Sequence, residues 1–148
     1  MSLCIVAVKD LVAYVKQERA ADLDNSGNTV YPDCEFSLYI GYGDFSLLRW
    51  NMGDALGFRH YFKSAKEPEP FPELWIDSDD NAPEHLKRFF FHSDCDGEYS
   101  SEDVKKLAES INEIETLIDR CGESDDNFND FKNFVIKSAK EHLAWIFC

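Results

Sequence analysis

Short apolar runs and amphipathic stretches alternate along this chain of 148 residues. Residues 4–8 form a short, β-branched apolar run that is typical of a buried strand. Residues 11–15 either extend this strand or begin another element. In residues 35–42 apolar and polar side chains alternate, which predicts a second strand with one apolar face. The side chains on that face are Phe36, Leu38 and Ile40.

Several later segments space their apolar residues by three and four, which predicts amphipathic helices. The first runs over residues 44–56 with Asp44 as its N-cap, and a short one follows Pro83 and reaches about Phe90. A long helix capped by Ser100 and Asp103 reaches Arg120, and a last helix follows it. The stripe of the long helix is Val104, Leu107, Ile111, Ile114 and Ile118, and that of the last is Phe128, Phe131, Val135 and Ala139.

Residues 143–147 form a final apolar run that predicts a terminal strand. Polar residues 17–33, the proline-containing residues 63–72 and the acidic residues 122–127 are predicted loops. This order of elements predicts an α+β fold, with a small, mostly antiparallel sheet and helices on one side. At this length we expect one globular domain over residues 1–148.

The chain is strongly acidic, with 29 acidic and 15 basic residues and a formal net charge of −14. This charge argues against binding nucleic acid through its phosphates, which requires Lys and Arg. It suits a basic protein partner through electrostatic attraction, and it equally suits simple solubility. The candidate residues for binding such a partner are Glu123, Asp125, Asp126 and Asp130, which lie in a run without Lys or Arg.

The five cysteines are odd in number and widely spaced, without a C-x-x-C pair. This pattern predicts neither a disulfide framework nor a zinc ribbon. The N-terminal apolar run lacks the basic region of a signal peptide, and no apolar stretch approaches ~18 residues. We therefore expect a cytoplasmic protein that does not bind membranes.

Residues 92–98 form the most distinctive motif, His-Ser-Asp-Cys-Asp-Gly-Glu. With Gly97 at position 6 of a calcium-binding EF-hand loop, Asp94 and Asp96 fall at positions 3 and 5. Glu98 then falls at position 7 and Asp103 at position 12, where a bidentate Glu is usual. Position 1 is His92, whose imidazole is a poor ligand for a hard cation such as calcium.

Two other interpretations of the motif remain open. His92 with Asp94 or Asp96 could bind a transition metal such as Zn²⁺ or Mn²⁺, and Cys95 with His92 could act as nucleophile and base. Both need a third partner, for which the candidates are His60, His85 and His142. Alternatively the motif is a structural turn, in which the aspartates accept backbone hydrogen bonds and Gly97 adopts a positive φ. This last interpretation leaves His92 unexplained.

Three segments of the chain resemble an uncharacterised family of small bacterial and phage-encoded proteins. Residues 40–45 with Arg49 look like the family's aromatic segment before a helix, and residues 91–97 are similar to its Phe-Ser-Asp-Cys-Glu/Asp-Gly motif. The final helix and terminal strand complete the resemblance, whereas a long hairpin over residues 17–33 and the proline loop depart from it. The resemblance implies a small cytoplasmic α+β domain in bacteria or their phages, and it indicates nothing about a reaction.

The leading hypothesis is a non-enzymatic acidic binding protein that inhibits or masks a basic protein partner, as immunity proteins and phage anti-defence proteins do. The first alternative is a metal-binding protein or metal-dependent enzyme that holds a divalent cation through His92, Asp94, Asp96, Glu98 and Asp103. The second is a small-ligand-binding protein with a pocket lined by Tyr42 and Arg49. Apart from that possible cation, no cofactor is expected.

Overall fold

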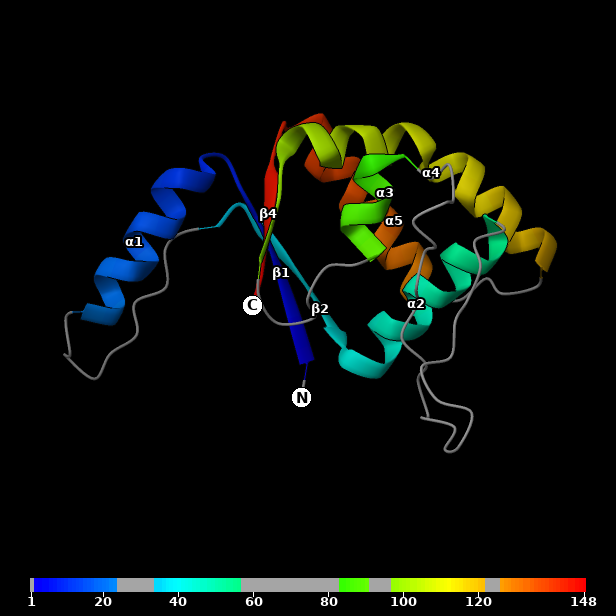
Figure 1. The fold of residues 1–148 in the computed structure, drawn as a ribbon, viewed down its shortest axis with the longest axis horizontal. Helices are drawn as coiled ribbons and strands as arrows, with labels where there is room; N and C mark the ends of the chain where they lie inside the picture. Colours follow the sequence, from blue (N-terminus) through cyan, green and yellow to red (C-terminus); the bar gives the residue numbers. More distant parts are fainter. Residues whose placement is uncertain (1, 24–33, 57–82, 91–96, 122–125) are drawn as a thin grey trace.

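The computed structural model describes residues 2–23, 34–56, 83–90, 97–121 and 126–148 (Figure 1). Within these residues the chain forms a four-stranded antiparallel sheet in the order β2-β1-β4-β3. The predicted α+β class is confirmed. The strands are β1 (Ser2–Val8), β2 (Phe36–Gly41), β3 (Gly97–Tyr99) and β4 (Ala144–Phe147).

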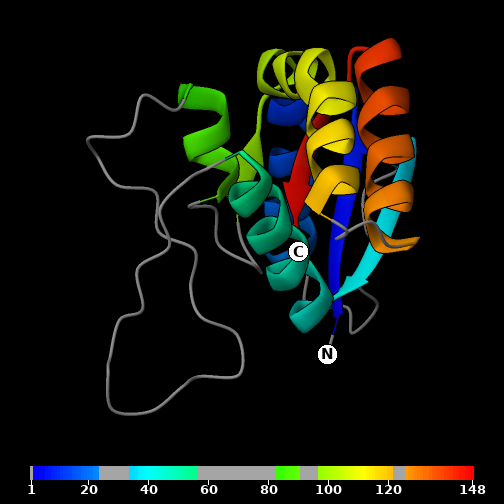
Figure 2. The same cartoon turned by 90° about the vertical axis from the view of Figure 1, so that its right-hand side faces the viewer.

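One face of the sheet is covered by four helices, which Figures 1 and 2 show gathered on the same side of β1 and β4. Because side chains alternate along a strand, every second residue of β1 faces these helices and the others face away. The long helix α4 buries its whole predicted stripe, and all five side chains are 0% exposed. The four helices are α2 (Tyr42–Ala55), α3 (Glu84–Phe90), α4 (Ser101–Cys121) and α5 (Asp126–Lys140).

The opposite face of the sheet carries a further helix, α1 (Leu11–Leu23), which lies apart from the other helices (Figure 1). The expectation of helices on one side only is therefore wrong. The physical reason is that this face is apolar too, and its cluster is Val6, Val8, Tyr14, Ala144 and Ile146. Asp10 caps α1, because its Oδ1 accepts a hydrogen bond from the Ala13 N–H at 3.0 Å.

Several predicted boundaries differ from the structure, and α5 begins at Asp126, inside the predicted loop over residues 122–127. The hairpin predicted over residues 17–33 is wrong up to Leu23, where α1 ends, and residues 24–33 lie outside the described part. Helix α2 follows β2 directly and begins at Tyr42, so Asp44 is in its first turn and is not the N-cap. Residues 97–99, where no strand was predicted, form the edge strand β3. The predicted loop over residues 63–72 lies outside the described part.

Trp145 lies at the centre of the core, where its side chain is 0% exposed. Its ring contacts Tyr99 of β3 in a stacked arrangement at 5.5 Å between centroids, and it also packs on Phe131 and Phe134 of α5. The indole N–H donates a hydrogen bond to the hydroxyl of Ser138 at 2.9 Å. This bond satisfies the polar atom that burial of a tryptophan would otherwise leave without a partner.

We expect Ser138→Ala to lower the free energy of unfolding by about 1–3 kcal/mol, because it leaves the buried indole N–H without an acceptor. Urea unfolding followed by circular dichroism measures the change. The control is Ser110→Ala on α4, whose hydroxyl donates to the Lys106 carbonyl at an exposed position and should change stability by less than about 0.5 kcal/mol. Equal effects of the two substitutions would contradict the role assigned to Ser138.

Candidate functional site

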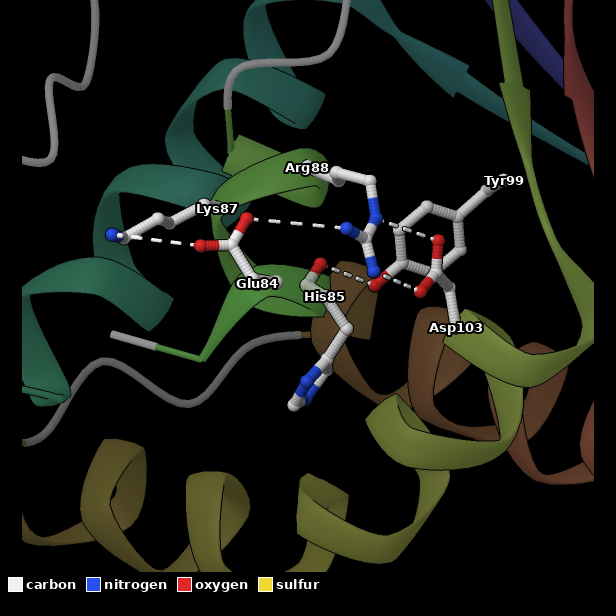
Figure 3. Close-up of polar contacts among 6 residues, drawn as sticks. All are labelled: Glu84, His85, Lys87, Arg88, Tyr99 and Asp103. Atoms are coloured by element: carbon white, nitrogen blue, oxygen red, sulfur yellow. Dashed lines mark hydrogen bonds and ion pairs between the residues drawn. The ribbon is translucent and has the colours of Figure 1, made fainter. Parts of the chain in front are cut away.

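The most developed polar cluster joins α3, β3 and the first turn of α4 (Figure 3). Arg88 on α3 binds Asp103 on α4 through two hydrogen bonds, from Nε to Oδ2 at 2.9 Å and from Nη2 to Oδ1 at 2.6 Å. A parallel pair of this kind is the strongest form of an arginine–carboxylate contact. Asp103 is almost fully buried, while half of the Arg88 side chain is exposed.

Local sequence explains how these side chains reach one another. Ser100 caps α4, since its hydroxyl accepts a hydrogen bond from the Asp103 N–H at 3.1 Å, as the sequence predicts. On α3, Glu84 lies 3.9 Å from the ammonium of Lys87 and 4.0 Å from the guanidinium of Arg88. Both pairs have the helical spacing at which neighbouring side chains meet. Glu84 therefore holds Arg88 on the side of α3 that faces Asp103.

Tyr99 of β3 contacts the backbone of α3 next to the Arg88–Asp103 pair (Figure 3). Its hydroxyl donates a hydrogen bond to the carbonyl oxygen of His85 at 2.6 Å, and its side chain is 1% exposed. Burial raises the pKa of the Tyr99 phenol far above its usual value, and the nearby Asp103 carboxylate adds to the rise. The phenol is therefore neutral at physiological pH and acts as a hydrogen-bond donor.

The charges of Asp103 and Arg88 stabilise each other. Burial alone would raise the pKa of Asp103, but the hydrogen bonds and positive charge of Arg88 outweigh it and hold the pKa below its usual value. The hydrogen bond to Asp103 likewise raises the pKa of Arg88. Both groups remain ionised over the physiological range. The pair is thus an electrostatic link between α3 and α4.

His85 is the residue of this cluster whose ring has unfulfilled hydrogen-bonding capacity. The residue is 8% exposed, and its Nε2 atom is buried without a hydrogen-bond partner. Burial lowers the pKa of His85, an effect opposed by the carboxylates of Asp103 and Glu109 and reinforced by the charges of Lys106 and Arg88. The ring is therefore neutral near pH 7.

The motif residues proposed as metal ligands are divided between described and undescribed segments. His92, Asp94 and Asp96 lie outside the described residues. Glu98 is exposed on β3 and lines a pocket on the α1 face, whereas Asp103 is bound to Arg88 on the helical side. The structure does not bring these two carboxylates together. Within the described ranges, no three His, Cys, Asp or Glu side chains gather as a metal site would require.

Gly97 agrees with the structural interpretation of the motif. Its φ is 127°, a conformation that side-chain-bearing residues rarely adopt. It begins β3, and its Cα lies opposite that of Phe147 on β4. The predicted positive φ of Gly97 is confirmed, and the role of the preceding residues stays a prediction.

The proposed ligand-pocket residues pack against the core. Tyr42 is half-buried beside it, and Arg49 is 9% exposed. The Arg49 guanidinium lies 4.5 Å from the ring centroid of Phe45 and donates a hydrogen bond to the carbonyl oxygen of Phe90 at 3.4 Å. These contacts give Arg49 a role in joining α2 to the end of α3.

A pocket of about 310 Å³ lies instead on the α1 face of the sheet. The residues that line it are Leu11, Val12, Val15, Lys16 and Glu98. Val12 at its rim is 78% exposed. Its apolar walls are Leu11, Val12 and Val15, and its charged side chains are Lys16 and Glu98.

Of the residues proposed to bind a basic partner, Glu123 and Asp125 lie outside the described part. Asp126 and Asp130 are exposed in the first two turns of α5. Their spacing of four residues places both carboxylates on one side of the helix.

Sequence reasoning did not identify the Arg88–Asp103 pair or the burial of His85. The available signal was the spacing of Glu84 and Arg88 at i and i+4 beside a capped helix that begins with acidic residues. That signal predicts a charged helix surface but cannot indicate which helix end lies across from it.

Comparison of the chain with family models, with curated proteins and with solved structures gave no match. Among the helices that the structure describes, none combines the length and apolar character needed to cross a membrane.

Removing the Arg88–Asp103 pair should destabilise the fold. In a double-mutant cycle of Arg88→Gln and Asp103→Asn at pH 7 we expect a coupling of about 1–2 kcal/mol, because the half-exposed arginine is partly screened by water. The pKa of Asp103 is lowered in the folded state. The stabilisation is therefore complete above the pKa that Asp103 has in the unfolded chain, and it is lost as the pH falls through the pKa that Asp103 has in the folded protein. A cycle of Lys9→Gln and Glu35→Gln, an exposed pair at 3.5 Å, should give less coupling. Equal coupling in both cycles would argue against a special role for Arg88.

His85 should make the fold sensitive to mild acid. The pKa of His85 is lowered in the folded state, so below pH 6.5 the unfolded chain binds more protons than the folded one. The free energy of unfolding therefore decreases as the pH decreases, until the pH is below the folded-state pKa. His85→Leu should remove this part of the pH dependence, as measured by urea midpoints between pH 7.5 and 5. The control is His142→Asn at an exposed left-handed position, φ 57°, that Asn tolerates. A slope that His85→Leu leaves unchanged would exclude His85 as its source.

Proposed function

We propose that this chain is a non-enzymatic binding protein that acts on a basic protein partner through an acidic surface around the start of α5. Following the resemblance of the motif, the partner is a bacterial protein, and the chain inhibits or masks it. The described residues support a binding role because their most developed polar cluster consists of satisfied structural contacts and a buried histidine.

The observation that carries this proposal is that Asp126 and Asp130 are exposed and lie in a stretch of sequence without Lys or Arg. Between Arg120 and Lys132 the chain has no Lys or Arg. On α4, by comparison, the exposed Glu102 and Glu109 lie one helical turn from Lys105 and Lys106, so that their fields partly cancel. Other carboxylates are bound internally, such as Glu115, which accepts a hydrogen bond from the Lys132 ammonium at 2.6 Å.

The net charge of the whole chain is consistent with a basic partner. Of the 29 acidic residues, 12 lie in the segments outside the described part, together with three of the 15 basic residues. Glu123 and Asp125 immediately precede α5 in sequence, so the carboxylates of Asp126 and Asp130 continue an acidic run. A surface of one sign attracts an oppositely charged protein over about 8 Å at physiological salt.

The test begins with recovery of the tagged protein from bacterial lysate at 50 mM NaCl and identification of the proteins that elute with salt. The purified candidate partner is then titrated by calorimetry. We expect Kd to rise at least about tenfold between 50 and 300 mM NaCl, because screening weakens attraction between exposed charges. The double variant Asp126→Asn/Asp130→Asn should raise Kd about three- to tenfold at low salt.

The matched control is Glu102→Gln/Glu109→Gln, which removes the same charge from exposed positions of α4 that lie one helical turn from Lys105 and Lys106. It should leave Kd within about twofold of the wild-type value. Binding that is insensitive to salt, or equally weakened by both double variants, would assign recognition to another surface or to the charge of the chain as a whole.

A further inference from the structure

Cys4 and Cys148 lie opposite each other at one end of the sheet. The Cys4 N–H donates a hydrogen bond to the Cys148 carbonyl at 2.8 Å, and the Cys148 N–H donates to the Cys4 carbonyl at 2.8 Å. This reciprocal pair of bonds identifies two directly opposed residues, continuing the register that places Ile5 opposite Phe147. In such a pair the Cα atoms are about 5.5 Å apart, within the range of about 4.4–6.8 Å that a disulfide spans.

The two thiols are also on the same side of the sheet. Directly opposed residues of antiparallel strands project to one face, and Cys4 packs against the apolar cluster beneath α1. The Cys148 thiol donates a hydrogen bond to the Cys4 carbonyl at 3.4 Å, so it lies over its neighbour. Cys148 is exposed and Cys4 is partly buried, and the structure holds both as thiols.

We propose that Cys4 and Cys148 form a dithiol site that a small-molecule disulfide, such as oxidised glutathione, converts reversibly to a cross-strand disulfide. The exposed Cys148 thiolate attacks one sulfur of oxidised glutathione, which forms a mixed disulfide and releases one glutathione thiolate. The Cys4 thiolate then attacks the Cys148 sulfur and releases the second glutathione. Two protein thiols lose two protons and two electrons, and oxidised glutathione gains them as two thiols.

The same geometry makes this bond easy to reduce. Side chains of a hydrogen-bonded pair stand further apart than those of a non-hydrogen-bonded pair, so bond formation draws the ends of β1 and β4 together. A disulfide formed against such resistance, at an exposed position, is more reducible than a buried structural one. The site therefore responds to the thiol–disulfide balance of its surroundings and is independent of the acidic surface on α5.

Oxidation should stabilise the fold. The bond joins the two middle strands of the sheet and closes a loop that contains nearly the whole chain, which restricts the unfolded state. Because drawing the strand ends together opposes this gain, we expect the melting temperature to rise by about 5–10 °C.

The experiment treats the folded protein with oxidised glutathione and follows the intact mass, tryptic peptides and melting temperature. We expect a loss of about 2 Da, corresponding to two hydrogens, and a linked pair of tryptic peptides, residues 1–9 with residues 141–148. Dithiothreitol should restore the reduced mass and the lower melting temperature. Cys4→Ser and Cys148→Ser should each abolish the linked peptides.

Cys34→Ser is the matched control, because Cys34 is also exposed but lies near the other end of β1, roughly 15 Å from Cys4. This variant should keep both the linked peptides and the rise in melting temperature. Persistent glutathione adducts on Cys4 or Cys148, a link from either to another cysteine, or a Cys4–Cys148 link without change in melting temperature would each overturn the proposal.

Discussion

The burial of Trp145 on β4 is the interaction on which the other contacts of this fold depend. Its ring contacts the edge strand β3 through Tyr99 and the helix α5 through Phe131 and Phe134, while its N–H binds Ser138. The stacked contact fixes the position of Tyr99, whose hydroxyl then reaches the backbone of α3. Trp145 thus contacts the sheet and α5 directly, and it contacts α3 indirectly through Tyr99.

The polar cluster at the start of α4 follows from this arrangement. Once Tyr99 holds α3 in place, Arg88 faces the first turn of α4, where the burial of Asp103 would be costly without a counter-ion. Arg88 is half-exposed and therefore loses little hydration. The Asp103 carboxylate is buried, and the hydrogen bonds from Arg88 compensate for its lost hydration. The Arg88–Asp103 pair therefore fixes the position of α3 against the first turn of α4, which the apolar contacts of these helices do not do alone.

Much of the fold was predictable because its signals are periodic. The alternation in residues 36–41 and the stripe of α4 report directly on which side chains are buried. Helix α1 was not predicted, since an apolar start followed by polar residues fits several structures equally well. Strand β3 has only three residues, and it exists because Tyr99 packs on Trp145, a contact across more than 40 positions of sequence.

The candidate site was less predictable for the same reason. The cap formed by Ser100 is a local contact and could be recognised from residue spacing. The partner of Asp103 comes from a different helix, so the same carboxylate was equally compatible with metal binding. Composition pointed to a basic partner, but only the placement of Asp126 and Asp130 on an exposed helix surface indicates where such a partner would sit.

The position of β4 in the sheet has a consequence for how the protein is made. This strand pairs with β1 and β3, yet more than 130 residues separate it from β1 in sequence. At roughly 5–20 residues per second, a ribosome needs on the order of 10–30 s after finishing β1 before β4 is synthesised. During that interval both faces of β1 are apolar and one of its edges has no β4 to pair with. Until β4 is synthesised, the nascent chain therefore exposes an apolar strand with an unpaired edge, which favours contacts with other chains.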